Sequence, residues 1–216
     1  MPNLEIATII IIAANVLFSI KGFNNFNFFE KYKFNIAGIR RGEQIRMLTS
    51  GFLHVDFSHL LFNMFTFFFF AHVVMRAVGV IQFVIIYVLS LLVGNLLSFL
   101  FHKDEYHYSA VGASGAVTGI LYSAILIAPE MDLYLYFIPI PIPAWIFGIL
   151  YLLYSIYGMK SRQGNIGHDA HFGGAIAGYL LTIVFLPSLL LTSLWLVAAL
   201  AVPIVILFIL YKLGKI

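Results

Sequence analysis

Long runs of apolar residues, separated by short polar segments, recur along the whole chain. Seven runs approach the roughly 20 residues that a helix needs to cross a bilayer. They cover residues 4–20, 57–75, 80–101, 111–128, 133–158, 169–190 and 192–211. The pattern predicts a bundle of transmembrane helices, an all-α fold in which consecutive helices run in opposite directions.

Prolines modify three of these runs. Pro139, Pro141 and Pro143 would remove hydrogen bonds from a helix, so the fifth helix is expected to begin near Pro143 and to end at Tyr157. Pro187 is expected to end the sixth run, and Pro203 to interrupt the seventh.

The composition supports a polytopic membrane protein. Of the 216 residues, 62% are hydrophobic and only 10% are charged, and the mean hydropathy is +1.01, far from a soluble domain. The chain has no cysteine, which excludes disulfides and thiolate catalysis. Its net charge of +3 is scattered over loops and gives no indication of nucleic-acid binding. No basic segment precedes the first apolar run, so that run is expected to be retained.

The longest interruption, residues 21–56, mixes aromatic and basic side chains. Its phenylalanines and cations are Phe23, Phe26, Phe28, Phe29, Phe34, Lys31, Lys33, Arg40 and Arg41. This composition suits the headgroup region of a bilayer, beside the bundle.

Polar residues with catalytic potential occur near the beginning of the even-numbered runs. His59 and Asn63 open the second run, Ser114 the fourth and His171 the sixth. Because these three helices run in the same direction, the four side chains should share one membrane face, at most about 10 Å deep. Polar groups within apolar spans are energetically costly and usually mark function.

Two glycine patterns predict how the fourth and sixth helices meet. Gly115 and Gly119 follow Ser114, and Gly174 and Gly178 follow His171, each as a GxxxG motif. Such small faces allow two helix backbones to touch. If they pack together, Ser114 and His171 project from matching ends of the contact.

A serine beside a histidine can act as an activated nucleophile and general base. His59 and Asn63, four residues apart, lie on one helical face and could donate to an oxyanion together with the backbone N–H of Ser114. The alternative for His59 and Asn63 is simple interhelical hydrogen bonding that holds the bundle together.

Other polar residues fit catalysis less well. His54, His59, His168 and His171 could be combined into a metal site, but the sequence lacks an HExxH motif and an intraspan carboxylate. No metal or cofactor is therefore predicted. The missing carboxylates also disfavour an aspartyl protease. Asp169 is expected on another side of its helix than His171, which favours a role as an N-terminal cap or in the helix dipole. His54 is expected to connect the loop to the bundle.

Taken in order, these motifs resemble the rhomboid family of intramembrane serine proteases. The resemblance rests on Arg46, on His54, His59 and Asn63 in HxxxxHxxxN, on Gly112, Ser114 and Gly115 in GASG, on AHFGGAIAG at 170–178, and on the proline-rich IPIPIPAW before the fifth helix. It implies a dyad of nucleophile Ser114 and base His171 without a third acidic member, and an oxyanion hole of His59, Asn63 and the Ser114 amide.

The resemblance also implies an arrangement of the chain. A six-helix catalytic core would occupy residues 1–190, and an additional transmembrane helix with a short tail would occupy residues 191–216. Substrate helices would enter beside the fifth helix, under a cap formed by residues 159–168. Two positions depart from the family. Thr118 stands where a bulky aromatic often packs on the histidine ring, and Ile45 stands where tryptophan often precedes the arginine.

The expected partners are transmembrane protein substrates and the lipid bilayer; the oligomeric state is not determined. The family implies a plasma (inner) membrane protein whose site opens to the extracytoplasmic side. The positive-inside rule favours the opposite orientation, because most cations lie in loops on the face that bears Ser114. The family orientation is preferred because much of the first loop is expected to be embedded and Arg46 is expected to be structural.

Two other functions remain as alternatives. A catalytically inactive rhomboid-like protein would bind client transmembrane helices without cleaving them, although intact Ser114 and His171 argue against it. A small-molecule transporter would need polar residues reaching both faces, whereas here they cluster at one.

Overall fold

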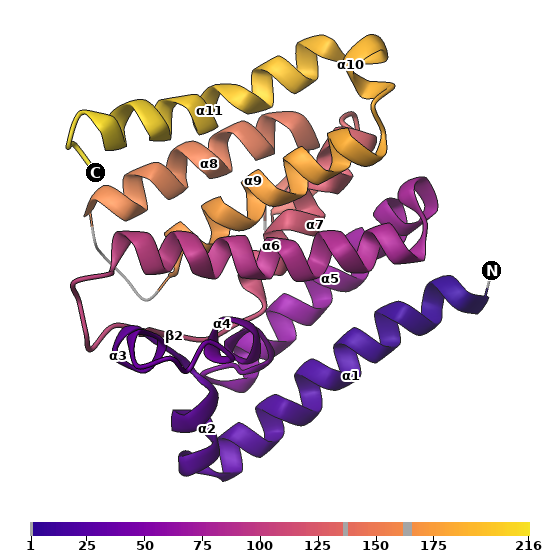
Figure 1. Cartoon of the computed structure of the whole chain (residues 1–216). Coiled ribbons are helices and arrows are strands. Elements are labelled where there is room, and N and C mark those ends of the chain that lie inside the picture. Colours follow the sequence, from indigo (N-terminus) through magenta and orange to yellow (C-terminus); the bar gives the residue numbers. More distant parts are fainter. Residues whose placement is uncertain (1, 136–137, 162–165) are drawn as a thin grey trace.

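The computed structural model describes residues 2–135, 138–161 and 166–216, and seven of its helices follow the seven apolar runs (Figure 1). They are α1 (Pro2–Asn24), α5 (Phe57–Val78), α6 (Val80–Phe101), α7 (Ser114–Ile127), α8 (Ala144–Ser161), α9 (His168–Phe185) and α11 (Leu194–Lys212). The predicted all-α transmembrane bundle is confirmed.

The segment between α1 and α5 folds into short elements beside the bundle (Figure 1). These are α2 (Phe26–Tyr32), strand β1 (Phe34–Asn35), α3 (Ile36–Arg40), α4 (Arg46–Thr49) and a 3₁₀ turn, η1 (Ser50–Phe52). β1 pairs antiparallel with β2 (Ser109–Ala110), so this first loop is joined to the segment that leads into α7.

Helix α7 is the central helix of the bundle. It has 14 residues, and every one from Gly115 to Leu126 is buried. One apolar cluster joins it to α5 and α6 through side chains such as Phe67, Phe83 and Ile120. A second cluster joins it to α8, α9 and α11. Ser114 therefore begins a helix that other helices surround.

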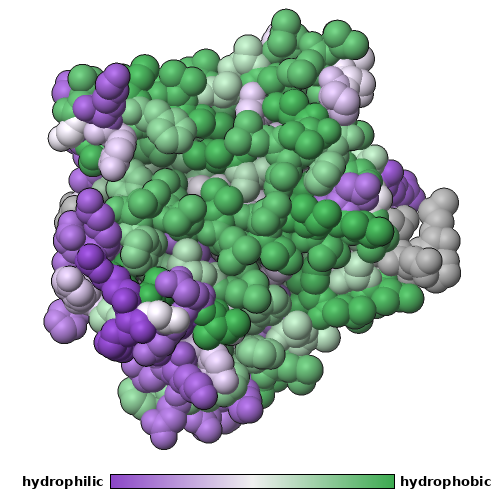
Figure 2. Space-filling model, viewed as in Figure 1, coloured by the Kyte–Doolittle hydropathy of each residue, from purple (hydrophilic) through white to green (hydrophobic). Residues whose placement is uncertain are grey.

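The outside of the bundle is apolar. Within the described residues, four helices, α1, α5, α6 and α11, are both long and apolar enough to cross a membrane, and α7 is a shorter apolar helix. On α5 the side chains of Phe65, Phe68 and Phe69 are largely exposed, as expected for groups that face lipid. Figure 2 shows an apolar surface across most of the molecule, with hydrophilic residues gathered mainly at the side that carries α2 and α3. The chain is an integral membrane protein.

Prolines act at the fifth and sixth helices much as predicted. α8 begins at Ala144, directly after Pro143, but ends at Ser161, four residues later than expected. The preceding residues form a strand pair that the apolar pattern did not predict, β3 (Asp132–Leu135) with β4 (Ile138–Pro143). α9 ends at Phe185, two residues before Pro187.

The prediction for Pro203 is wrong, because α11 continues through it. Proline removes one hydrogen bond, and packing of the helix must then supply the stabilisation. Leu196, Val197, Leu200 and Leu207 of α11 are buried in the cluster shared with α8 and α9.

The short helix α10 (Leu189–Thr192) joins α9 to α11, which lies beside α8 (Figure 1). Trp195 of α11 meets Trp145 of α8 edge to face, with ring centroids 5.6 Å apart. The hydroxyl of Tyr179 on α9 donates to the carbonyl of Val197 at 2.8 Å. The seventh helix is thus packed on the bundle through both α8 and α9.

Candidate active site

Ser114 is the first residue of α7, and the segment that leads into it passes close to His59 of α5. Gly112, two residues earlier, has φ +133°, a conformation that side chains rarely adopt. A Cβ there would lie 2.8 Å from His59 Cε1 and 3.7 Å from Ser114 Oγ. Glycine at this position therefore lets the chain pass between the imidazole of His59 and the hydroxyl of Ser114.

The two GxxxG faces meet directly. A Cβ added at Gly174 would lie 1.9 Å from the carbonyl oxygen of Gly115, and one at Gly178 would lie 2.1 Å from that of Gly119. No larger residue fits at either contact without separating the helices. Gly115 also approaches the beginning of α9, because a Cβ at Gly115 would lie 3.2 Å from the carbonyl oxygen of Ala170. The contact therefore brings together the residues that follow Ser114 and precede His171.

His171 lies in the first turn of α9, and its ring is held by α8. The hydroxyl of Tyr151 is 2.8 Å from His171 Nδ1. The two rings are nearly parallel, with 18° between their planes and centroids 6.2 Å apart. Thr118 of α7 hydrogen-bonds to Tyr151 in turn. The His171 ring is therefore supported by Tyr151 of α8, rather than by an aromatic side chain at position 118 of α7.

The polar face of α5 lies next to Ser114. Asp56 caps the helix by accepting the backbone N–H of His59 at 2.7 Å. One turn further on, Asn63 is 3% exposed. Its Nδ2 has no hydrogen-bond partner within the described part of the chain. A buried amide donor without a partner is costly, and such groups often mark a place where a ligand oxygen binds.

His54 connects the first loop to both sides of the site. Its Nδ1 is 2.9 Å from Ser19 Oγ on α1, and its Nε2 accepts the backbone N–H of Ala113 at 3.4 Å. The ring also meets that of His59 edge to face at 4.9 Å. Burial lowers the pKa of His54 to about 3. This neutral imidazole fixes the residue that precedes Ser114 and supports His59.

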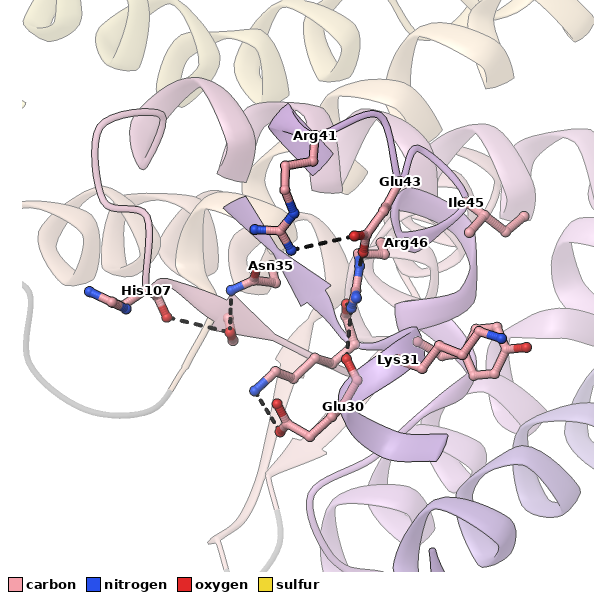
Figure 3. Close-up of a pocket in the computed structure, with 11 residues that line it drawn as sticks. Glu30, Lys31, Asn35, Arg41, Glu43, Ile45, Arg46 and His107 are labelled. Carbon is pink, nitrogen blue, oxygen red and sulfur yellow. Dashed lines mark hydrogen bonds and ion pairs between the residues drawn. The ribbon is translucent and has the colours of Figure 1, made fainter. Parts of the chain in front are cut away.

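Arg46 organises the first loop through three hydrogen bonds. Its Nη1 donates to the carbonyls of Glu30 and Lys33 at 2.8 and 2.9 Å, and its Nε donates to the Glu43 carboxylate. This guanidinium lowers the pKa of the Glu43 carboxyl. Figure 3 shows Arg46, Glu30 and Glu43 around a pocket of about 760 Å³. The first loop, His107 and Ser109 line this pocket, and no residue of α7 or α9 does.

Asp169 is turned away from His171, as its spacing on the helix predicts. It is 4% exposed, and its Oδ2 lies 3.6 Å from Nε2 of His102, a residue at the end of α6. Ser114, His59 and His171 remain half-buried. A solvent molecule or a peptide could therefore contact these three side chains. The expected cap, residues 159–168, includes 162–165, which lie outside the described residues.

The sequence patterns did not predict two residues of this arrangement, Tyr151 and Ser19. Tyr151 gives no motif, because it is one of several aromatics in an apolar run, and only its position on the face toward α9 distinguishes it. Ser19 likewise looks like an ordinary polar residue of the first helix. The helical period could have placed Tyr151 on the same face as Gly148, whose carbonyl accepts the Tyr122 hydroxyl.

The fold and the polar groups at one end of it define a polytopic helical membrane protein with a serine and a histidine at the ends of two contacting helices. The family model for the rhomboid domain matches residues 41–188. The chain belongs to the rhomboid family.

Similar proteins come from organelles and from bacteria. The chain is 28% identical over 182 residues to "RHOMBOID-like protein 12, mitochondrial" of Arabidopsis thaliana, a match covering 77% of this chain and 54% of that protein. It is 30% identical to "Putative rhomboid protease YdcA" of Bacillus subtilis, covering 68% of this chain and 70% of that one. "Rhomboid protease GluP" of the same bacterium is also 30% identical, over 65% of this chain and 26% of its own length. The chain thus spans about half of the Arabidopsis protein.

Proposed function

We propose that this chain is an intramembrane serine endopeptidase in which Ser114 and His171 form a catalytic dyad. The observation that carries the proposal is the glycine contact between α7 and α9, which joins Gly115 to Gly174 and Ala170. Both reactive side chains adjoin this contact and are half-buried. The family membership and the protease names of the two bacterial relatives support the same activity.

The reaction divides into acylation and deacylation. Ser114 Oγ attacks the carbonyl carbon of the scissile peptide bond while Nε2 of His171 takes the hydroxyl proton. The tetrahedral intermediate collapses, the C–N bond breaks, and His171 returns the proton to the leaving amine. A water molecule then gives a proton to His171 and attacks the acyl-enzyme ester. Breaking the C–O bond to Ser114 releases the new carboxyl end and restores the serine hydroxyl.

The negative charge of each tetrahedral intermediate needs donors that are already in position. The Nδ2 of Asn63 is a buried donor that has no partner among the described residues, and His59 lies beside Ser114 across Gly112. The backbone N–H of Ser114 belongs to the first turn of α7, where helix N–H groups lack intrahelical partners. These three groups are assigned to the oxyanion hole.

The substrates are transmembrane segments of other membrane proteins. Such a segment would enter from the bilayer beside α8, where α5 and α8 both present exposed apolar side chains, among them Phe65 and Tyr154. Because a helix hides its peptide bonds, cleavage should favour segments with small or helix-destabilising residues that unwind readily.

The site is proposed to open to the extracytoplasmic side of a plasma membrane, against the positive-inside rule. Arg46 supports this reading, since its side chain is only 11% exposed and holds the loop by hydrogen bonds. Reporters fused at residue 105 and at the C-terminus test the orientation. A cytosolic signal at residue 105 would overturn it.

The activity is tested with purified protein in proteoliposomes that contain a model transmembrane substrate. Wild-type protein should cleave the substrate and react with a fluorophosphonate probe, whereas Ser114→Ala and His171→Ala should do neither. Ser109→Ala is the matched control, because Ser109 is an exposed serine five residues earlier. Cleavage that persists in Ser114→Ala would refute the mechanism. Wild-type protein that binds the segment but reacts with no probe would instead indicate an inactive, client-binding protein.

A further inference from the structure

Three hydrogen-bonding side chains from three helices form a chain that ends at the general base. His171 of α9 contacts the hydroxyl of Tyr151 of α8 through Nδ1 at 2.8 Å. Tyr151 hydrogen-bonds to Thr118 of α7, and Thr118 is 4% exposed. In such a buried chain each proton has few alternative acceptors.

The direction of these hydrogen bonds follows from what the base must do. A neutral imidazole carries one proton, so one ring nitrogen donates and the other accepts. If Nε2 is to take the proton of Ser114, then Nδ1 must carry the N–H and donate it to Tyr151. The Tyr151 hydroxyl then has to donate elsewhere, and Thr118 Oγ1 is the acceptor within reach.

We propose that Tyr151 is a positioning residue that holds His171 in the tautomer with the proton on Nδ1, and that Thr118 orients the Tyr151 hydroxyl. This inference rests on the proposed dyad and adds a condition to it. Because Tyr151 belongs to α8, the base is prepared only while α8 is packed against α7 and α9.

The packing of α8 against its neighbours fixes the position of Tyr151 along the helix axis and the side of α8 on which it lies. One turn before it, the carbonyl of Gly148 accepts the hydroxyl of Tyr122 on α7. A Cβ at Gly148 would lie 3.1 Å from Ile125 on α7 and 3.1 Å from Leu200 on α11. Helix α8 is therefore held between α7 and α11, and a displacement of α8 by an entering substrate would also move Tyr151 relative to His171.

The small side chain at position 118 is part of this arrangement. Thr118 lies one turn below Ser114 on α7, on the same face. A bulky aromatic there would compete with the Tyr151 ring for the space beside the imidazole. Threonine leaves that space to Tyr151 and supplies a hydroxyl, which valine of similar shape would not.

The tautomer can be measured without any substrate. Protein with ¹⁵N-labelled histidine is prepared in detergent, and the His171 resonances are identified among the seven histidines by their loss in His171→Gln. The ¹⁵N shifts of Nδ1 and Nε2 differ between the two neutral tautomers. We expect the Nδ1-protonated form in wild type, a mixture in Tyr151→Phe and Thr118→Val, and the wild-type form in Thr118→Ser.

Kinetics provide the second measurement. Tyr151→Phe keeps the ring and its stacking, so it should lower kcat about 10- to 100-fold with little change in KM, less than the loss of a general base. Thr118→Ser should restore the rate that Thr118→Val loses. Thermal unfolding identifies any variant that fails to fold.

The outcomes separate this inference from the proposed function. A wild-type His171 with its proton on Nε2, or a Tyr151→Phe protein with unchanged tautomer and kcat, would overturn the role of Tyr151. If the wild-type protein cleaves nothing, the proposed function fails, and the ¹⁵N spectra still decide whether Tyr151 sets the tautomer.

Discussion

Replacing Gly174 by alanine should separate the beginnings of α7 and α9 and slow cleavage strongly. The new Cβ would lie 1.9 Å from the carbonyl oxygen of Gly115, where real Cβ atoms essentially never come within 3.0 Å. The contacting atom is backbone, so no side chain can rotate away. The helices must therefore part by at least about 1 Å, and a shift of this size in reacting groups costs roughly 10²-fold in rate.

The same substitution should destabilise the protein moderately. Overpacking a well-packed contact costs about 1–3 kcal/mol, and each kcal/mol lowers Tm by about 2–4 °C in a chain of this size. At temperatures well below Tm, the variant should thus be folded but slow. Binding of an uncleaved transmembrane peptide should change less than kcat, because the substitution moves Ser114 relative to His171.

The assay compares cleavage of a model substrate in proteoliposomes with thermal unfolding of the same preparations. Gly167→Ala serves as the control, because among the described residues its Cβ would meet only Ala170, at 3.7 Å, an ordinary contact. Wild-type rates and Tm in Gly174→Ala would refute the argument that this glycine contact sets the distance between the two reactive residues.

Three further predictions concern the oxyanion hole and the first loop. Asn63→Ala should lower kcat about 10²- to 10³-fold without lowering Tm, since Nδ2 loses no partner present in the described residues; unchanged kcat would remove Asn63 from the oxyanion hole. Arg46→Ala should cost about 1–3 kcal/mol in unfolding experiments, because two carbonyl groups lose their donor; an unchanged Tm would contradict this. The folded pKa of His54 is lowered to about 3 from 6.5, so the unfolded chain binds its proton first. The contribution of His54 to the free energy of unfolding is therefore complete above pH 6.5 and is lost as the pH falls towards 3, by up to about 1.4 kcal/mol per pH unit. His54→Gln should flatten the pH dependence of the free energy of unfolding, measured by chemical denaturation. An equally steep profile in this variant would exclude His54 as the cause of the pH dependence.

Local pattern was enough for much of the candidate site. Ser114, His171, His59 and Asn63 were found because polar groups are rare in apolar runs and because their depths agree. The glycine motifs predicted which helices touch, and the structure packs Gly174 against Gly115 and Gly178 against Gly119. These inferences depend only on helical geometry, which the sequence specifies directly.

Where the sequence analysis was wrong or silent, contacts between distant segments decided the outcome. Pro203 lies inside α11 because this helix is packed on α8 and α9. Local helix propensity does not include such contacts between helices. The strand pair before α8 was missed for a related reason, since an apolar run alone does not distinguish a short strand from a buried helix segment.

The sequence by itself determined the class of this protein: a bundle of apolar helices with a serine, two histidines and an asparagine at one end, in the order of the rhomboid family. Periodicity and hydropathy are local properties, so they are readable without a structure. Only the tertiary structure decided what supports His171, because Tyr151 reaches it from another helix at a separation of 20 residues. Such a contact depends on how α7, α8 and α9 pack together, and no local pattern encodes it.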